Sequence, residues 1–134
     1  MTLLVDTNVL VDVFQDDPEW ADWSIAQLRA QAQIHELAIN GIVYAELSAA
    51  FERYEELDEA IAELGLILLE IPRPAFFLAG KAFVRYRGSG GEKSGVLPDF
   101  LIGAHSAVEG MPLLTRDVRR YRSYFPSVTL LAPE

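Results

Sequence analysis

The sequence predicts an α/β fold, in which helices cover both faces of a mainly parallel β-sheet. Short apolar runs alternate along the chain with longer segments whose apolar residues recur at helical spacing. The runs are continuously apolar, as expected of strands buried on both faces. The chain has 134 residues, of which 51% are hydrophobic, so it can build one core and suits a single domain over residues 1–134.

The first half of the chain contains three expected strands, each followed by helical segments. We expect strands at residues 2–5, 37–39 and 66–69, and helices at residues 8–14, 19–33, 42–53 and 54–64. Pro18 separates the first two helices, Asn40 is placed to cap the third, and Gly65 ends the fourth.

The second half continues the alternation. We expect helices at residues 75–87, 98–108 and 117–124, and strands at residues 112–115 and 128–131. Residues 88–95 are rich in glycine and are expected to form a flexible loop. A phosphate-binding loop is rejected there, because Glu92 stands directly before Lys93, where that motif needs glycine.

Composition narrows the class of protein further. The net charge of −9 argues against a general nucleic-acid binder, but the charge is uneven. Residues 1–70 hold fifteen acids and two bases, whereas residues 71–134 hold five acids and nine bases. The absence of cysteine excludes disulfides and thiolate metal sites. With no signal-peptide pattern and no run near the ~20 apolar residues of a membrane span, we expect a soluble, cytoplasmic protein without membrane contact.

Four acids stand where a cleft is expected to form. Asp6 ends the first strand, and Asp117 follows a later strand by two residues, at the edge where α/β sheets bind ligands. Glu46 lies on the flank of an apolar helical stripe, and Asp99 opens an apolar helix. Each acid alone is well explained as a helix cap or a solvated side chain. The four together favour a shared site.

Converging carboxylates would repel one another, and a divalent cation removes that repulsion. Oxygen ligands without cysteine favour Mg²⁺ or Mn²⁺. Such a site can activate water and neutralise a phosphate, as in phosphodiester hydrolysis.

Four blocks of the sequence resemble the PIN-domain family, and most closely the VapC-like toxins of type II toxin–antitoxin pairs. The blocks are LLVDTNVLVDVF, IVYAELSAAF, LPDFLIGAHSAVEG and LLTRDVRRYRSYFP, which lie between residues 3 and 126 and so extend over nearly the whole chain. The resemblance implies a three-layer α/β/α sandwich acting as a metal-dependent endoribonuclease. It implies catalytic, metal-binding roles for Asp6, Glu46, Asp99 and Asp117, and supporting roles for Asn8 and Thr115.

The resemblance also implies products and partners. Family members cut the RNA backbone with a metal-activated water and leave a 5′-phosphate and a 3′-hydroxyl. They are usually homodimers, and a cognate antitoxin inhibits them by filling the active-site groove, often with an arginine among the acids. We therefore expect an RNA substrate, an antitoxin partner and a homodimer.

The bases of the second half are candidates for holding RNA phosphates. The candidates are Arg116, Arg119, Arg120 and Lys93, of which Arg116 stands out because it lies between Thr115 and Asp117. Tyr86, Tyr121 and Tyr124 lie among the bases of this half and suit either stacking on nucleotides or packing.

Two other classes of function remain open. A PIN-like module could bind RNA or protein without cutting it, although the complete set of acids counts against this. A small-molecule phosphatase is weaker, because aspartyl-phosphate phosphatases carry a second Asp two residues after the first, and here that residue is Asn8.

Overall fold

The computed structural model describes residues 1–91 and 94–134 and contains a five-stranded sheet with the order β3-β2-β1-β4-β5. All four strand pairings are parallel. The strands are β1 (Thr2–Val5), β2 (Glu36–Asn40), β3 (Ile67–Leu69), β4 (Leu113–Leu114) and β5 (Leu130–Leu131). The predicted α/β class is therefore confirmed, and the described sheet is parallel throughout.

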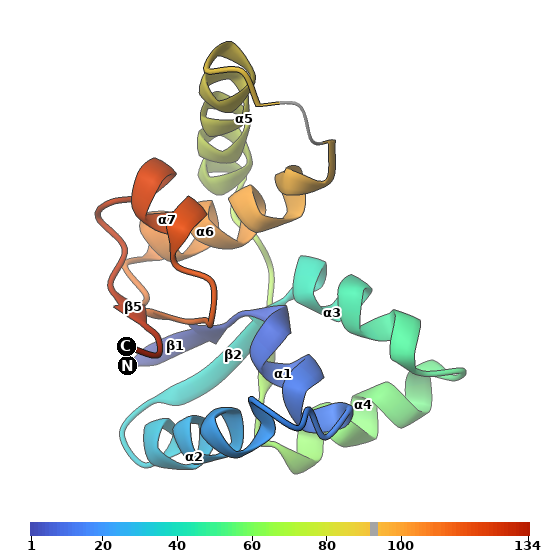
Figure 1. Cartoon of the computed structure of the whole chain (residues 1–134). Helices are drawn as coiled ribbons and strands as arrows, with labels where there is room; N and C mark the ends of the chain where they lie inside the picture. Colours follow the sequence, from blue (N-terminus) through green and yellow to red (C-terminus); the bar gives the residue numbers. More distant parts are fainter. Residues whose placement is uncertain (92–93) are drawn as a thin grey trace.

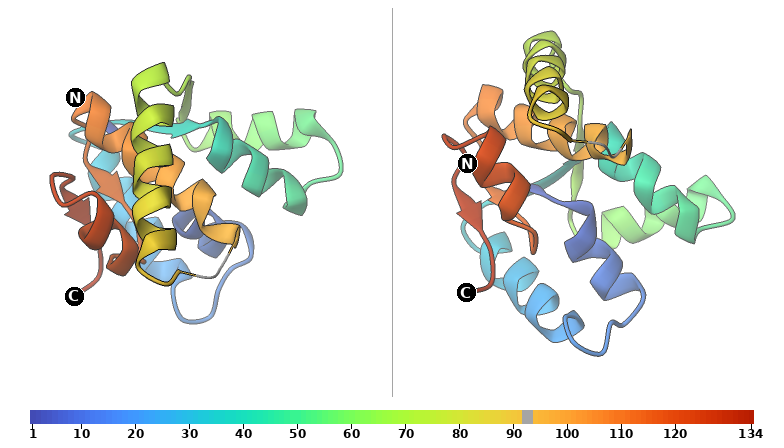
Figure 2. Two further views of the ribbon diagram at one scale, coloured as in Figure 1. Left: turned by 90° about the horizontal axis from the view of Figure 1, so that it is seen from above. Right: turned by 45° about the horizontal axis from the view of Figure 1, so that its top comes forward.

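Helices cover both faces of the sheet. The chain moves from β1 outward to β3, then returns past β1 to β4 and β5. Crossovers between parallel strands are right-handed. The helices of the path from β1 to β3 and those of the path from β3 to β5 therefore lie on opposite faces of the sheet. Accordingly, α5 (Arg73–Gly88), α6 (Leu97–Glu109) and α7 (Arg119–Tyr124) lie on one side in Figures 1 and 2. The other side holds α1 (Thr7–Phe14), α2 (Ala21–Ala32) and α4 (Tyr54–Glu63), while α3 (Gly41–Leu47) follows β2.

The core lies between the helices and the central strands. Leu3, Leu4 and Val5 of β1 are fully buried, as are both residues of β4, so the middle of the sheet is covered on both faces. This burial explains why the strands read as continuous apolar runs. No helix in the described part of the chain is long and apolar enough to cross a membrane.

Most helix boundaries differ from the predictions by one or two residues, and one helix is much shorter than predicted. The helix predicted over residues 42–53 ends at Leu47 and continues only as a 3₁₀ turn, Ser48–Ala50. Phe51, which falls within the predicted helix, has extended backbone and packs edge-on against Phe14, with ring centroids 5.5 Å apart. The last helix begins at Arg119 rather than at residue 117, because Thr115 and Asp117 form a local hydrogen-bonded turn. Of the predicted loop at residues 88–95, two residues lie outside the described part.

Gly103 permits the close packing of α6 on α7. A Cβ atom at Gly103 would stand 2.5 Å from the Phe125 ring and 3.1 Å from the Tyr121 ring. We expect Gly103→Ala to lower the free energy of unfolding by about 2 kcal/mol, because the core is overpacked. Gly80→Ala is the matched control: Gly80 lies in α5 with open space around it, so its substitution should be neutral or stabilising by up to ~1 kcal/mol. Urea unfolding compares the two variants. Equal free energies of unfolding would show that α7 shifts to accommodate the added methyl group without cost.

Candidate active site

The sheet reverses its direction of growth at β1, and Asp6 stands directly after that strand. Ligands bind at such switch points, outside the carboxyl ends of the strands. Asp6 is buried, with 4% of its surface exposed, and it caps α1 by accepting a 2.7 Å hydrogen bond from the Thr7 amide. The Asp6 carboxylate therefore lies at the centre of the candidate site.

Three side chains donate hydrogen bonds to the second oxygen of Asp6, Oδ2. The Thr115 hydroxyl donates at 2.8 Å, the Tyr121 hydroxyl at 2.9 Å and the Asn8 amide at 3.3 Å. Asn8 also donates to Thr115 Oγ1 and accepts from the Arg116 amide at 3.1 Å. These contacts tie α1 to the turn after β4 and fix the orientation of the Asp6 carboxylate. Asn8 and Thr115 thus lie beside the Asp6 carboxylate, and the supporting roles that the resemblance implies for them stay a prediction.

Asp99 and Asp117 approach Asp6 from the second half of the chain. Asp99 lies in the first turn of α6, and its negative charge contributes to the raised pKa of Asp6. Asp117 is exposed in the turn after β4, where its amide donates to Thr115 Oγ1 at 3.1 Å, and its charge contributes to the raised pKa of Asp99. The three aspartates are therefore close enough to affect one another electrostatically.

Glu46 reaches the site through a neighbour of Asp6. Its Oε1 accepts a 2.6 Å hydrogen bond from the Thr7 hydroxyl, and its side chain is exposed. Thr7 precedes Asn8 in the first turn of α1, so α3 is joined to α1 beside Asp6. Sequence reasoning did not identify Thr7, although its place between two predicted site residues was a signal.

Burial dominates the electrostatics of the site. Burial raises the pKa of Asp6 from 3.8 to about 6, although the Thr115 and Tyr121 hydrogen bonds oppose the rise. Burial also raises the pKa of Asp99, and the Arg120 contact opposes it. The pKa of Tyr121 is raised well above its usual value by burial and by the nearby acids. Tyr121 therefore stays protonated and acts as a hydrogen-bond donor to Asp6.

The donor set suits a hard divalent cation, but the side chains are not arranged as a ready coordination sphere. Asp6, Asp99 and Asp117 supply carboxylate oxygens, the ligands that Mg²⁺ and Mn²⁺ prefer. Within residues 1–91 and 94–134, however, no three acidic or histidine side chains lie close enough to hold an ion as they stand. Arg120 is hydrogen-bonded to Asp99 Oδ2 and takes up one of the expected ligand atoms.

The raised pKa of Asp6 predicts an unusual pH dependence of stability. Between its unfolded pKa of 3.8 and its folded pKa of about 6, Asp6 keeps its proton only in the folded state. Its contribution to stability is therefore full below the unfolded value and is lost as pH rises through the folded value, by about 3 kcal/mol in total. In chelator, we expect urea unfolding to show wild type losing more stability than Asp6→Asn between about pH 4 and pH 7. Parallel pH profiles for the two proteins would contradict this.

Arg116 has a partner that the sequence did not reveal. Its Nε and Nη2 donate to the two carboxylate oxygens of Asp12 at 2.6 and 2.9 Å, and its guanidinium lies 5.0 Å from the centre of the Trp20 ring. Asp12 is 2% exposed and also accepts from the Ser24 hydroxyl at 2.8 Å. Arg116 thus joins the turn after β4 to α1 and α2. Its proposed phosphate contact stays a prediction, and this pairing gives it a structural role.

The other predicted RNA-binding bases fall in different places. Arg119 is exposed, Arg120 is half-buried beside Asp99, and Lys93 lies outside the described residues. Arg119 and Arg120 line a hollow of about 350 Å³ that also reaches Asp117. Tyr121 is 1% exposed, so it packs in the core and cannot stack on a nucleotide.

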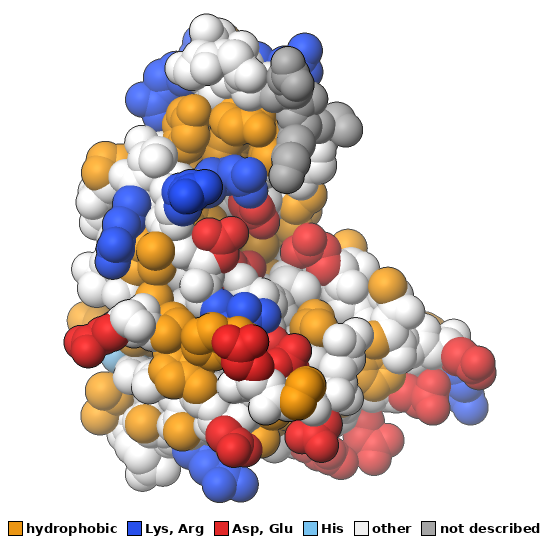
Figure 3. Space-filling view, viewed as in Figure 1, with side chains coloured by type: hydrophobic (Ala, Val, Ile, Leu, Met, Phe, Trp, Pro, Cys, Tyr) orange, Lys and Arg blue, Asp and Glu red, His pale blue; other side chains and the backbone are white. Residues whose placement is uncertain are grey.

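Acidic and basic side chains gather in separate places on the surface of the molecule. Figure 3 shows acidic side chains gathered near the middle of one face, with basic side chains directly above them. Another acidic group lies at the lower right, over α4 (Figures 1 and 3). Helix α4 carries acids in its first turn, and α7 carries a base in its last. The acidic centre therefore has a basic border on one side.

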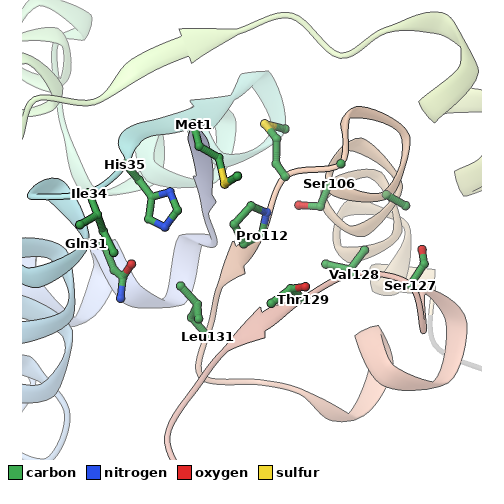
Figure 4. Close-up of a pocket in the computed structure, with 13 residues that line it drawn as sticks. Met1, Gln31, Ile34, His35, Ser106, Pro112, Ser127, Val128, Thr129 and Leu131 are labelled. Atoms are coloured by element: carbon green, nitrogen blue, oxygen red, sulfur yellow. The ribbon is translucent and has the colours of Figure 1, made fainter.

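Neither histidine belongs to the acidic site. His105 is 1% exposed and shares a 3.1 Å hydrogen bond with Asn40 inside the core. His35 lines a cavity of about 480 Å³ at the opposite, amino ends of the strands, where Met1 and Pro112 precede β1 and β4. Figure 4 shows His35 and Ser106 to either side of Pro112. No Asp, Glu, Lys or Arg side chain lines this cavity, so none of the predicted acids or bases belongs to it.

The family model of the PIN domain matches residues 3–125. The chain belongs to the PIN domain family. The five-stranded parallel sheet between two helical layers agrees with this assignment. A comparison with curated proteins finds no match.

Solved structures with the same PIN fold cover the whole chain. VapBC2 from Rickettsia felis, bound to a DNA fragment from its promoter, has a TM-score of 0.76 at 21% identity, covering 100% of both chains. VapBC-1 from nontypeable Haemophilus influenzae has a TM-score of 0.73 at 18% identity, covering 98% of each chain. DNA-bound VapBC from Salmonella typhimurium has a TM-score of 0.69 at 19% identity, again covering 98% of each. At these identities the likeness establishes the fold.

Proposed function

We propose that this PIN domain is a metal-dependent endoribonuclease and the toxin of a toxin–antitoxin pair. The observation that carries the proposal is the buried Asp6 carboxylate at the switch point, oriented by three donors and electrostatically coupled to Asp99. Burial makes ionisation of the Asp6 carboxylate unfavourable even with these hydrogen bonds, and a bound cation would offset that cost.

Each residue has a separate task in the proposed reaction. Asp6, Asp99 and Asp117 hold Mg²⁺ or Mn²⁺, directly or through water, and Glu46 holds the ion or orients the attacking water. When bound, the cation supplies activation of that water and neutralises charge on the scissile phosphate. Thr115, Asn8 and Tyr121 keep the Asp6 carboxylate in one orientation, as outer groups around a metal do.

The hollow beside Asp117 suits the backbone of an RNA strand. It is lined by two arginines and two tyrosines: Arg119, Arg120, Tyr86 and Tyr124. Arginine pairs well with phosphate, and tyrosine offers a ring face to an unpaired base. A strand lying in this hollow would bring a phosphate beside Asp117 and the remaining acids.

The toxin assignment and the partners rest on the structural neighbours. These are VapBC complexes, and one from Mycobacterium tuberculosis is described as a member of the VapBC family of toxin-antitoxin systems. We propose a cognate antitoxin that fills the acidic groove and a cytoplasmic location. We also propose a homodimer, for which the exposed apolar side chains of Leu68, Phe76 and Phe77 offer a surface.

A non-cleaving RNA-binding PIN module is the second candidate. One observation favours it: Arg120 already neutralises Asp99, so part of the acidic charge is balanced without a cation. A module of this kind would bind RNA equally well with and without divalent ions. The first candidate requires an ion for cleavage.

Cleavage of single-stranded RNA by the purified protein separates the two candidates. We expect products with Mn²⁺ or Mg²⁺ and none in excess chelator, with activity returning when the ion is restored. Cleavage that persists in chelator would contradict a metal-dependent nuclease. RNA binding without cleavage under both conditions would favour the binding module, and hydrolysis of a generic phosphate ester without action on RNA would favour a phosphatase.

A further inference from the structure

Arg120 is placed among the acids of the candidate site. It extends from α7, and its Nη1 donates to Asp99 Oδ2 on α6. The guanidinium also lies 5.9 Å from the centre of the Tyr86 ring. Both members of the pair are half-buried, with 25% of the Arg120 side chain and 31% of the Asp99 side chain exposed. The contact is therefore shielded from water more than a surface ion pair is.

Among the described residues, Arg120 is the base that forms an ion pair with one of the four site acids. The other described ion pairs join Arg53 to Glu55 and Arg116 to Asp12. Asp99 is half-buried near Asp6 and Asp117, and each added negative charge there disfavours ionisation of the others. The Arg120 guanidinium opposes that repulsion, as a divalent cation at the same acids would.

Arg120 also faces the hollow that suits an RNA backbone. It lines that hollow together with Arg119 and Asp117, so a change of side-chain rotamer can turn its guanidinium from Asp99 toward a phosphate. A cation bound by Asp99 would repel a guanidinium at the same oxygen and favour that change. Arg120 would then contact Asp99 in the cation-free protein and the substrate phosphate in the cation-bound protein.

We propose that Arg120 is a built-in counter-ion that competes with the divalent cation for Asp99 and moves to the substrate phosphate once the cation binds. The proposal rests on the proposed function, because it takes the four acids as a metal site. It assigns Arg120 a role in metal affinity that a plain phosphate-binding arginine lacks. A purely supporting arginine would have the opposite effect, since its loss would weaken metal binding.

A Mn²⁺ titration without RNA tests the sign of this effect. Isothermal titration calorimetry would compare wild type, Arg120→Gln and Arg122→Gln. We expect Arg120→Gln to lower the Kd for Mn²⁺ by about three- to tenfold, because one competing charge is removed. Arg122 is exposed on the same helix and controls for the loss of charge, so its variant should stay within about twofold of wild type. Unchanged or weaker binding in Arg120→Gln would overturn the proposal.

A second variant and a thermal unfolding measurement distinguish a change in Mn²⁺ affinity from misfolding of Arg120→Gln. Arg120→Lys keeps the charge but loses the planar fork, and we expect it to bind Mn²⁺ with a Kd between those of wild type and Arg120→Gln. Mn²⁺ should raise the Tm of Arg120→Gln more than that of wild type, because tighter binding stabilises the folded state further. An equal or smaller rise would count against competition.

RNA cleavage at saturating Mn²⁺ tests the second half of the proposal. We expect Arg120→Gln to lose about tenfold in kcat/KM although it binds Mn²⁺ more tightly, because the phosphate loses a charged partner. Undiminished cleavage would show that Arg120 does not reach the phosphate. If wild type binds Mn²⁺ but cuts no RNA, the proposed function fails while the counter-ion role stands on the titration. If wild type binds no Mn²⁺, both fail.

Discussion

Asp6→Asn is expected to reduce RNA cleavage about a thousandfold, because the amide has one neutral oxygen in place of the carboxylate that we propose to bind a cation. Metal coordination at a phosphate supplies several kcal/mol of transition-state stabilisation, and each ~1.4 kcal/mol is a factor of ten. The substituted side chain keeps its size and can still cap α1 by accepting from the Thr7 amide. The Tyr121 hydroxyl can rotate to accept from the new amide group, and the substitution gives up the long 3.3 Å hydrogen bond from Asn8. The loss of activity should therefore come without loss of the fold.

The control for this substitution is Asp22→Asn, on the exposed surface of α2. Its cleavage rate should equal that of wild type. Circular dichroism and urea unfolding of Asp6→Asn should show a folded protein that, in chelator near pH 7, is at least as stable as wild type. A folded Asp6→Asn variant with wild-type cleavage would refute a catalytic role for this carboxylate.

Arg116→Ala is expected to lower the free energy of unfolding by about 3 kcal/mol, because it leaves the Asp12 carboxylate buried without its ionic partner. Asp12 is 2% exposed, and the Ser24 hydroxyl is its remaining described donor. The substitution also removes the guanidinium that packs over Trp20. Because Arg116 precedes Asp117 and its amide binds Asn8, RNA cleavage should fall as the turn loosens.

A double-mutant cycle separates this structural role from a role in phosphate binding. Adding Asp12→Asn to Arg116→Ala removes the stranded charge and should recover part of the lost stability. Arg119→Ala, an exposed neighbour on α7, should change stability by less than about 0.5 kcal/mol. An Arg116→Ala protein as stable as wild type, but with weaker RNA binding, would support the phosphate contact suggested by the sequence.

The strands and the position of Asp6 could be predicted because both depend on local sequence. A continuous apolar run specifies a buried parallel strand, and a polar residue directly after it falls at the edge where such sheets bind ligands. The turn at residues 115–117 could be placed for the same reason, because it directly follows the apolar run that forms β4. Because β4 pairs with β1, this turn lies beside Asp6, and a 2.8 Å hydrogen bond joins Thr115 to the Asp6 carboxylate.

The partners of Arg116, Tyr121 and Glu46 could not be predicted, because they depend on tertiary packing. Arg116 and Asp12 are 104 residues apart, and Tyr121 and Asp6 are 115 apart. Arginine is long and has several rotamers, so its place in the sequence between two site residues does not determine which acid it meets. Tyr121 lies in a strongly basic helix, so the sequence left both stacking on nucleotides and packing open. Gly103 leaves room for its ring, since a Cβ atom there would stand 3.1 Å from it.

The end groups of the cleaved RNA test the catalytic proposal most directly. A water activated at a cation held by Asp6, Asp99 and Asp117 would attack phosphorus, break its bond to the 3′-oxygen, and leave a 5′-phosphate and a 3′-hydroxyl. Attack by the neighbouring 2′-hydroxyl needs no metal ion and leaves a 2′,3′-cyclic phosphate and a 5′-hydroxyl. Mass spectrometry of fragments produced in Mn²⁺ should find 5′-phosphate and 3′-hydroxyl ends. Fragments with cyclic phosphate ends would contradict a metal-activated water at these acids.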